Sequence, residues 1–456
     1  MKEKSPSLPL KTHRVLQSPF SKKEEGESKI ISFSLESSAK VFFYPTPHFQ
    51  SFFCCCLVGV GSADDPVGKA GLAHFVEHML FQGNAHFANH LAIFRYLDSL
   101  ASEVNAATSH NQTSYWMEGA NLHWKENIKT LTQLLFFPTF EPLEKEKSVV
   151  HQEIQSELNY EGEITNSEDW IYSLLWPDQP LGQPIFGDVK SVASFQKEEL
   201  IGFHSQFYHP ANCTFGVVGN INQKELKEHL NALIPAKKKE QNLKFLRKKQ
   251  RVTQALHLEK KVGYDSATVI CHRAYSLEGA NKKTKIEVEI LANLLESGFS
   301  SYLVRNLRED LGLVYEISTS TFFYEDYAIL SIRGETAAEN YQSYQKNLNL
   351  LLENLTRTNF LDWELEILKK KKKLAQETLQ ENPKFYLLNV LEENFSDHFT
   401  FEEFLSLLLS SKSEDFAPLL QSIFSSKPKV ELVLAAKEAL KKWAQEEKKQ
   451  KGKKEK

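Results

Sequence analysis

The chain has 456 residues, more than one ordinary hydrophobic core holds, so two domains of roughly 200 residues are expected. Hydrophobic residues make up 41% and charged residues 25%, which is typical of a globular protein and excludes a fibrous or wholly disordered chain. The 55 basic and 59 acidic side chains give a net charge of −4, so nothing suggests a nucleic-acid partner. No apolar run is long enough to span a membrane, and we expect no membrane partner.

The N-terminal segment and the cysteines indicate a reducing compartment. Residues 1–29 are polar, contain several prolines and lack the apolar stretch of a secretory signal, so we expect a mobile N-terminal arm. The five cysteines include the adjacent Cys54, Cys55 and Cys56 and have neither metal-binding nor redox spacing. We therefore expect packed, free thiols and a cytoplasmic location.

A first domain is expected over residues 30–236, and it opens with three strands. Residues 30–35 and 40–44 read as short strands joined by a serine-rich turn, and residues 52–61 as a third, mostly buried strand. The loop at 62–68, with its proline and glycine, then leads to the first helix.

That helix carries the most informative residues of the chain. The segment 71–83, Gly-Leu-Ala-His-Phe-Val-Glu-His-Met-Leu-Phe-Gln-Gly, has the period of an amphipathic helix. His74 and His78 are one turn apart on one face, where two neutral imidazoles can bind one tetrahedral zinc ion. Glu77 points to the same side and can accept a proton from a water on that ion. His-x-x-Glu-His is the inverted form of the zinc peptidase motif, so the sequence predicts a zinc site here.

The remainder of the first domain supplies candidates for a third metal ligand. We expect helices over 91–100, 125–137, 142–158 and 200–207, a strand hairpin over 103–108 and 113–118, a surface loop over 176–187 and a strand over 213–218. A catalytic zinc needs a protein ligand besides two histidines. Glu146 and Glu153 are two helical turns apart and share a face, so either of them could bind the metal.

The second half of the chain repeats the first without its metal residues. A charged linker is expected over 237–252, a second domain over 253–445 and a disordered tail over 446–456. A shift of 220 residues relates Asn127, Ile128, Leu131 and Phe140 to Asn347, Leu348, Leu351 and Phe360, which indicates an internal duplication. Alignment of Gly83 with Gly298 places Glu289, Ala292 and Asn293 at the positions of His74, Glu77 and His78, and the shift of 220 places Lys373 at that of Glu153. A charged lysine cannot bind zinc, so we expect one metal-binding half and one inert half.

Taken together, these motifs resemble the pitrilysin or insulinase class of inverted-motif zinc metallopeptidases, and most of all its two-domain bacterial and mitochondrial-processing-peptidase-like members. The resemblance covers roughly residues 30–440. It is carried by Gly-Ser-Ala-Asp-Asp-Pro at 61–66, the helix at 71–83, Asn-Ala-Ala-Thr at 105–108, Glu146 with Glu153, and Leu-Arg-Glu-Asp-Leu-Gly-Leu-Val-Tyr at 307–315.

The resemblance implies a fold and a set of roles. The fold is α+β, with two homologous domains that each consist of an antiparallel sheet with helices packed on one face and together form half of a clamshell. One Zn²⁺ per chain would be held by His74, His78 and Glu153, with Glu146 supporting a ligand or the water and Glu77 acting as general base. Asn105 and Ala106 would hold the substrate backbone as an added strand.

The expected function is that of a zinc-dependent endopeptidase acting on peptides or short unfolded segments. In long relatives with four domains, an arginine and a tyrosine seven residues apart reach the zinc from another domain and stabilise the oxyanion. Arg308 and Tyr315 match this pair, so we expect a homodimer in which they act in trans. Two alternatives stay open: a dedicated maturation peptidase for a modified peptide or cofactor precursor, and a non-catalytic scaffold subunit of the same fold.

Overall fold

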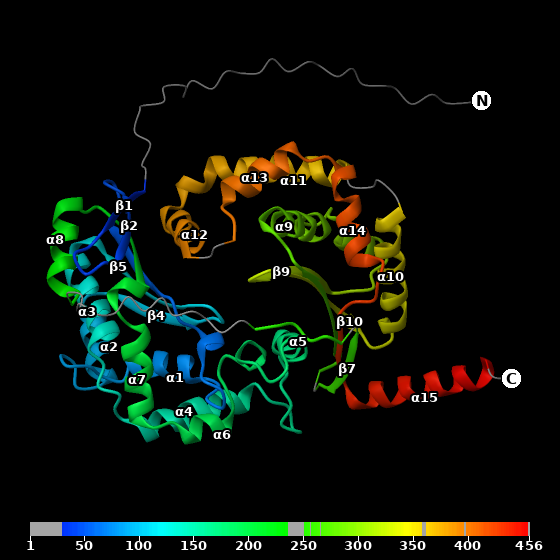
Figure 1. Cartoon of the computed structure of the whole chain (residues 1–456), viewed down its shortest axis with the longest axis horizontal. Coiled ribbons are helices and arrows are strands. Elements are labelled where there is room, and N and C mark those ends of the chain that lie inside the picture. The colour runs from blue at the N-terminus through cyan, green and yellow to red at the C-terminus, as the bar shows by residue number, and fades with distance from the viewer. Residues whose placement is uncertain are drawn as a thin grey trace, which may run out of the picture.

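A computed structural model describes residues 30–235, 250–255, 257–264, 266–357, 362–395 and 398–454 of the chain (Figure 1). The expected N-terminal arm and residues 237–249 of the expected linker lie outside these ranges. The end of that linker is packed: the buried Gln250 accepts the Leu181 N–H at 2.7 Å and donates to the Ala63 carbonyl at 3.2 Å. None of the described helices is long and apolar enough to cross a membrane.

The first domain is built on a six-stranded sheet. Its strands are β1 (Ile31–Ser34), β2 (Lys40–Pro45), β3 (Ser51–Val58), β4 (Glu103–Thr108), β5 (Thr113–Ala120) and β6 (Cys213–Gly219). They lie in the order β1-β2-β6-β3-β5-β4, in which only β2 and β6 run parallel. Central β3 is buried on both faces, as its apolar run predicts, and burial raises the pKa of its three cysteines.

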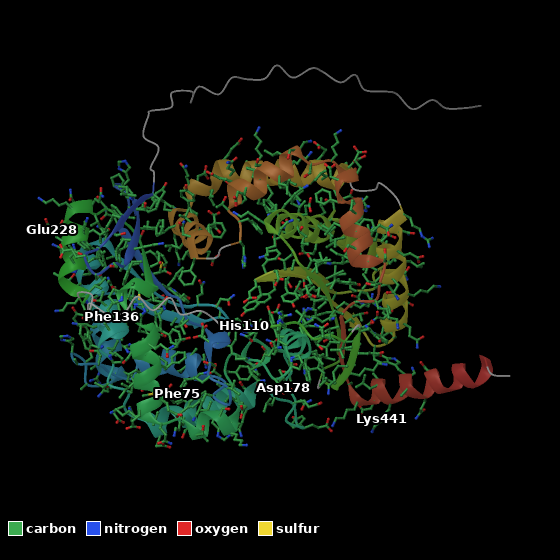
Figure 2. All side chains as sticks on the ribbon, viewed as in Figure 1. Phe75, His110, Phe136, Asp178, Glu228 and Lys441 are labelled. Carbon is green, nitrogen blue, oxygen red and sulfur yellow. The ribbon has the colours of Figure 1, made fainter. Side chains whose placement is uncertain are left out.

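Helices cover this sheet. They are α1 (Leu72–Leu80), α2 (His90–Ser99), α3 (Trp124–Phe136), α4 (Leu143–Ser156), α5 (Ser167–Leu175), α6 (Val189–Ser194), α7 (Lys197–Phe207) and α8 (Gln223–Leu233), with short 3₁₀ turns at Ser62–Asp64, Asn121–His123, Pro180–Gly182 and Pro210–Asn212. All except α5 gather with α1 at the left of Figure 1. Phe75 of α1 points into the core of this domain, whereas His110 at the β4–β5 turn lies towards the second domain (Figure 2).

The second domain repeats the strand order of the first. Its strands are β7 (Leu258–Gly263), β8 (Thr268–Glu278), β9 (Glu316–Tyr324), β10 (Tyr327–Ala337) and β11 (Val430–Ala435), in the order β7-β11-β8-β10-β9 with only β7 and β11 parallel. This is the order β2-β6-β3-β5-β4 of the first sheet. The shared topology supports the predicted duplication, and the single parallel pair makes each sheet mixed rather than purely antiparallel.

The helical segments of the second domain follow the same succession. They are α9 (Lys282–Glu296), the π-helical η5 (Val304–Asp310), α10 (Tyr341–Arg357), α11 (Asp362–Thr378), α12 (Pro383–Phe395), α13 (Phe401–Ser410), α14 (Ala417–Phe424) and α15 (Lys437–Lys454), with 3₁₀ turns at Leu379–Glu381 and Ser413–Phe416. Helix α15 continues through the expected disordered tail as far as Lys454. Its sequence is rich in Lys, Glu and Ala, which are strong helix formers, and this explains the difference.

The two domains exchange one helix each. Helix α5 of the first domain packs on β8 and β11 of the second sheet through Ile171 and Leu175. Its counterpart α12 packs on β2 and β6 of the first sheet through Leu387 and Leu391 (Figure 1). The expectation of helices on only one face is therefore incomplete, because each sheet buries its second face under a helix of the other domain.

Candidate metal centre and peptide-binding edge

Helix α1 is anchored where it begins. The buried carboxylate of Asp65 accepts the N–H groups of Gly71 and Ala73, each at 2.8 Å, which satisfies donors that the first turn leaves free. Gly71 has φ of 86°, and a Cβ there would lie 2.6 Å from the Phe186 carbonyl oxygen, so only glycine fits. Together these contacts fix how α1 presents its polar face.

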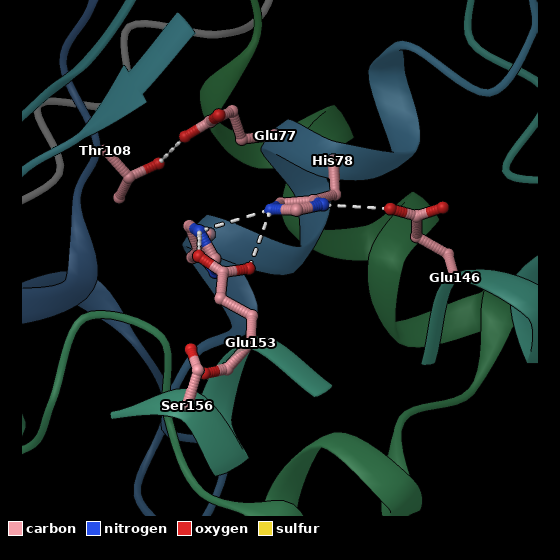
Figure 3. A network of polar contacts seen from close by, with 7 residues as sticks. Glu77, His78, Thr108, Glu146, Glu153 and Ser156 are labelled. Carbon is pink, nitrogen blue, oxygen red and sulfur yellow. Dashed lines mark hydrogen bonds and ion pairs between the residues drawn. The ribbon is translucent and has the colours of Figure 1, made fainter. Parts of the chain in front are cut away.

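That face brings the predicted histidines together with α4. Nε2 of His74 lies 3.3 Å from Nε2 of His78. The Glu153 carboxylate reaches both rings, at 3.6 Å from His74 Nε2 and 3.4 Å from His78 Nε2 (Figure 3). Among the described residues, these three form the one group whose donor atoms could hold a metal ion.

The spacing of these three donors fits zinc. Ligands at about 2.0–2.1 Å from a tetrahedral zinc ion are separated from one another by roughly 3.3–3.4 Å. The two nitrogens and the carboxylate oxygens of the cluster are 3.3, 3.4 and 3.6 Å apart. Two imidazoles and one carboxylate are also the donor set of many catalytic zinc sites.

Glu146 has a different place from Glu153, although sequence spacing alone left the two equivalent. Its buried carboxylate lies 2.8 Å from Nδ1 of His78, on the side of the ring away from Nε2. A carboxylate only accepts hydrogen bonds, so Nδ1 carries a proton and Nε2 is the ring nitrogen that is left to bind a metal ion. Glu146 therefore orients a ligand and does not belong to the donor set.

The pKa values of the residues in the cluster are shifted in opposite directions. Burial, and then the neighbouring charge of His78, lower the pKa of His74 to about 4. Burial would also lower the pKa of His78, but hydrogen bonds to Glu146 and Glu153 outweigh it and raise this pKa to about 10. The hydrogen bond to His78 holds the pKa of Glu153 below its usual value. The two carboxylates thus supply the negative charge that a cation at this point needs.

Glu77, the residue before His78 on α1, faces the same space. Its side chain is only 9% exposed, and burial raises its pKa. Thr108, the last residue of β4, donates a hydrogen bond to its Oε2 at 2.5 Å. Sequence reasoning gave no role to Thr108 or to Asp65, although both lie in segments that carry the family resemblance.

A cavity of about 310 Å³ adjoins Glu77 and His78. One wall is the segment Val104–Ala106 of β4, and the apolar rings of Phe81 and Phe94 also line it. Strand β4 is the edge of its sheet, so an added strand can pair with its outer side, where the Asn105 side chain now accepts the Ala106 N–H at 2.8 Å and would have to release it. The structure thus brings the predicted Asn105 and Ala106 next to the metal-binding residues.

The second domain keeps the scaffold of this site with other residues. Glu289 of α9 accepts a hydrogen bond from Thr321 of β9 at 2.5 Å, much as Glu77 does from Thr108. Asn293 donates to Glu289. Burial lowers the pKa of Lys372 of α11, and the nearby charge of Glu289 partly offsets this shift. Among the described residues, none of these residues belongs to a group that could hold a metal ion.

Arg308 and Tyr315 lie at the surface of the second domain. Arg308, in η5, is stacked 5.7 Å from the centre of the Phe299 ring and lies 3.6 Å from Glu309. Tyr315 precedes β9 and is 78% exposed. The contacts of the Arg308 side chain are with its own domain, and the Tyr315 N–H is donated to the Glu335 carbonyl of β10, so the structure does not bring the two residues to the metal-binding residues of the same chain.

Comparison with known proteins relates both halves of the chain to one peptidase family. The family model "Insulinase (Peptidase family M16)" matches residues 47–189, and "Peptidase M16 inactive domain" matches residues 194–372. An uncharacterized zinc protease of Rickettsia felis is 26% identical over 403 residues, which is 86% of this chain and 94% of that protein. Another from Bacillus subtilis is 28% identical over 349 residues, 74% of this chain and 81% of the relative.

Solved structures show the same fold. A protease from Helicobacter pylori has a TM-score of 0.77 at 18% identity, over 89% of this chain and 99% of that one. The periplasmic protease PqqL of Escherichia coli has a TM-score of 0.73 at 18% identity, but this chain covers only 48% of it. Two consecutive models of one peptidase family, zinc proteases among the relatives and the shared fold lead to one assignment: the chain belongs to the insulinase family of zinc peptidases, M16.

Proposed function

We propose that this protein is a zinc-dependent endopeptidase that hydrolyses peptides or short unfolded segments. The observation that carries the proposal is the cluster of His74, His78 and Glu153, whose donor spacing fits zinc, with Glu77 beside it. A scaffold role is less well supported, because a scaffold subunit does not require three intact metal ligands. Here all three are present, and Glu146 orients one of them, His78.

Glu77 and Thr108 have separate roles in the proposed hydrolysis. A bound zinc ion would supply an activated water and polarise the scissile carbonyl. Glu77 accepts the proton of the attacking water and later delivers it to the leaving amine. The raised pKa of Glu77 makes its carboxylate a stronger base, and the Thr108 hydroxyl fixes the direction in which it points.

The edge of the first sheet supplies the substrate-binding surface. A peptide added alongside β4 pairs with the backbone at Asn105 and Ala106, which places its carbonyl groups near Glu77. The cavity beside Glu77 accepts one side chain next to the scissile bond. Because Phe81 and Phe94 line it, we propose a preference for a large apolar residue at that position.

A second chain completes the site in this proposal. Arg308 and Tyr315 are exposed in the inert domain and are not brought to the metal-binding residues of their own chain. The PqqL chain is about twice as long as this one, so two copies of this chain together have about the length of one PqqL chain. In such a homodimer Arg308 and Tyr315 of one chain stabilise the oxyanion at the Glu77 of its partner.

Chelator-sensitive cleavage of a peptide library tests the peptidase function. The purified chain, with and without a chelator, is incubated with a mixed library, and products are identified by mass spectrometry. We expect cleavage that the chelator abolishes and added zinc restores, with large apolar residues enriched on one side of the cut. Absence of any chelator-sensitive product would contradict the proposal in favour of a scaffold or of a maturation peptidase with one substrate.

A further inference from the structure

A second cavity, of about 720 Å³, lies in the inert domain between α10, α14 and the strands β8 and β11. A volume of this size suffices for a small organic ligand. Arg273 is one of the lining residues and is only 4% exposed. No role in peptide hydrolysis accounts for this cavity, because it is lined by none of the residues of the metal centre.

Arg273 is held by a dense polar network. Its guanidinium lies 2.9 Å from Glu431 in an ion pair, donates to Asn349 at 2.7 Å and is hydrogen-bonded to Gln345. Glu431 comes from β11, and the two amides come from α10. The guanidinium is thereby fixed in one orientation beside the cavity, with four of its five N–H groups donated to Glu431, Asn349 and Gln345.

The duplication shows that the fold itself does not need this ion pair. Cys54 faces Val217 in the first sheet, and Cys271 faces Val433 in the second, which aligns the two ladders on an identical pair. The next pair on the same face is Cys56 with Phe215 in the first domain, both buried and apolar.

In the second domain that next pair is Arg273 with Glu431. An apolar pair fills the equivalent position of the same scaffold, and a buried ion pair is seldom more stabilising than an apolar one. The polar pair that lines the cavity is therefore better explained by binding than by folding.

The remaining lining residues define the ligand. Arg357 at the rim pairs with Glu353, and Arg273 with Glu431, which leaves the Lys427 ammonium as the surplus charge of the lining. Three aromatic rings line the walls, from Tyr275, Tyr341 and Phe424. We propose that this cavity binds a small molecule that carries a carboxylate next to an apolar or aromatic group, the class that includes free amino acids and dipeptides.

Calorimetry on the full-length, chelator-treated protein tests this site separately from the metal centre. The probes are phenylacetate and L-phenylalanine, with L-phenylalaninamide and phenethylamine as matched compounds without the carboxylate. We expect the two carboxylates to bind at least tenfold more tightly than the compounds that lack it. No detectable binding of either carboxylate at millimolar concentration would overturn the proposal.

Two variants locate the binding. The double variant Arg273→Cys with Glu431→Phe installs the pair of the first domain, and we expect it to stay folded and to lose at least tenfold in affinity. Ser426→Trp obstructs the cavity from an exposed position. It gives a second measurement of affinity in a variant whose hydrophobic core is unchanged. Lys283→Ala, on the exposed part of α9, is the control. Unchanged affinity in a folded double variant and in Ser426→Trp would overturn the assignment.

Discussion

Glu146 and His78 form the contact that distinguishes the two glutamates of α4: the carboxylate lies 2.8 Å from Nδ1 of the ring, opposite the nitrogen that faces His74 and Glu153. Glu153 thus offers its charge directly to a metal ion, whereas Glu146 offers it through the imidazole.

This difference predicts unequal effects of the same substitution. Glu153→Gln replaces an anionic donor with a neutral amide and should reduce zinc affinity severely. Glu146→Gln should reduce zinc affinity or activity by roughly 10- to 100-fold, as is usual for residues that orient a ligand. Competitive zinc titration of both variants measures this, and a larger loss in Glu146→Gln would show that the roles are reversed.

The anchor at the start of α1 gives a second prediction. Asp65→Ala removes the acceptor of the Gly71 and Ala73 N–H groups, which should destabilise the protein by about 0.5–2 kcal/mol. It should also weaken zinc binding, because α1 carries both histidines. Asp64→Ala is the matched control, since Asp64 accepts the Gly61 N–H and not one of α1. Equal effects of the two variants on melting temperature and zinc affinity would contradict an anchoring role.

Much of this site could be predicted from the sequence because its geometry is local. The i, i+4 spacing of His74 and His78 and the seven-residue spacing on α4 follow from helix periodicity alone. Which glutamate faces the metal depends on how α1 and α4 pack, and periodicity within one helix does not encode that. The choice of Glu153 rested on family resemblance, and the structure supplies its physical reason.

The exchange of α5 and α12 could not be predicted for a similar reason. Each helix buries two apolar residues one turn apart, Ile171 with Leu175 and Leu387 with Leu391, and this spacing does not show on which sheet they pack. The ion pair of Arg273 and Glu431 was also missed, because 158 residues separate the two and neither stands in a recognisable motif. The register of the two sheets reveals it.

A third prediction concerns acid pH and the contact between domains. His272 of β8 is hydrogen-bonded to Ser167 of α5 at 3.0 Å, and burial lowers the pKa of His272 to about 3. Below the ordinary pKa of about 6.5, His272 is protonated in the unfolded chain but stays neutral in the folded chain. The folded state therefore loses stability as pH falls from about 6.5 towards 3. We expect the melting temperature to fall steadily between pH 7 and 4.5.

His272→Gln tests the origin of this acid sensitivity. Glutamine is neutral throughout and can still reach Ser167, so the free energy of unfolding of the variant should fall by about 1.4 kcal/mol less for each pH unit below 6. Its melting temperature should therefore fall less steeply with pH. His204 serves as a comparison for a buried histidine that does not bridge the domains. Burial lowers its pKa to about 4, and its Nε2 lies 2.8 Å from the Leu135 carbonyl of the same domain. Identical pH slopes for wild type and His272→Gln would contradict the prediction.

The shared active site predicts complementation between inactive chains. Glu77→Ala and Arg308→Ala should each lose nearly all activity, whereas a re-equilibrated mixture should regain part of it. In a mixed dimer, one of the two sites has an intact Glu77 from one chain and an intact Arg308 from the other. Mixed dimers verified by native mass spectrometry that remain inactive would refute the trans arrangement without affecting the assignment of the metal centre.

The role of Glu77 is the central claim, and one paired measurement on Glu77→Gln tests it most directly. The variant keeps His74, His78 and Glu153 and replaces only the group that accepts the proton, so zinc content and turnover should separate. Metal analysis and peptide cleavage are measured on the same preparation beside wild type. The account predicts one zinc per chain in both proteins and a loss of turnover of at least about 100-fold in the variant, in line with the usual contribution of a general base. Full zinc content with wild-type turnover would contradict it.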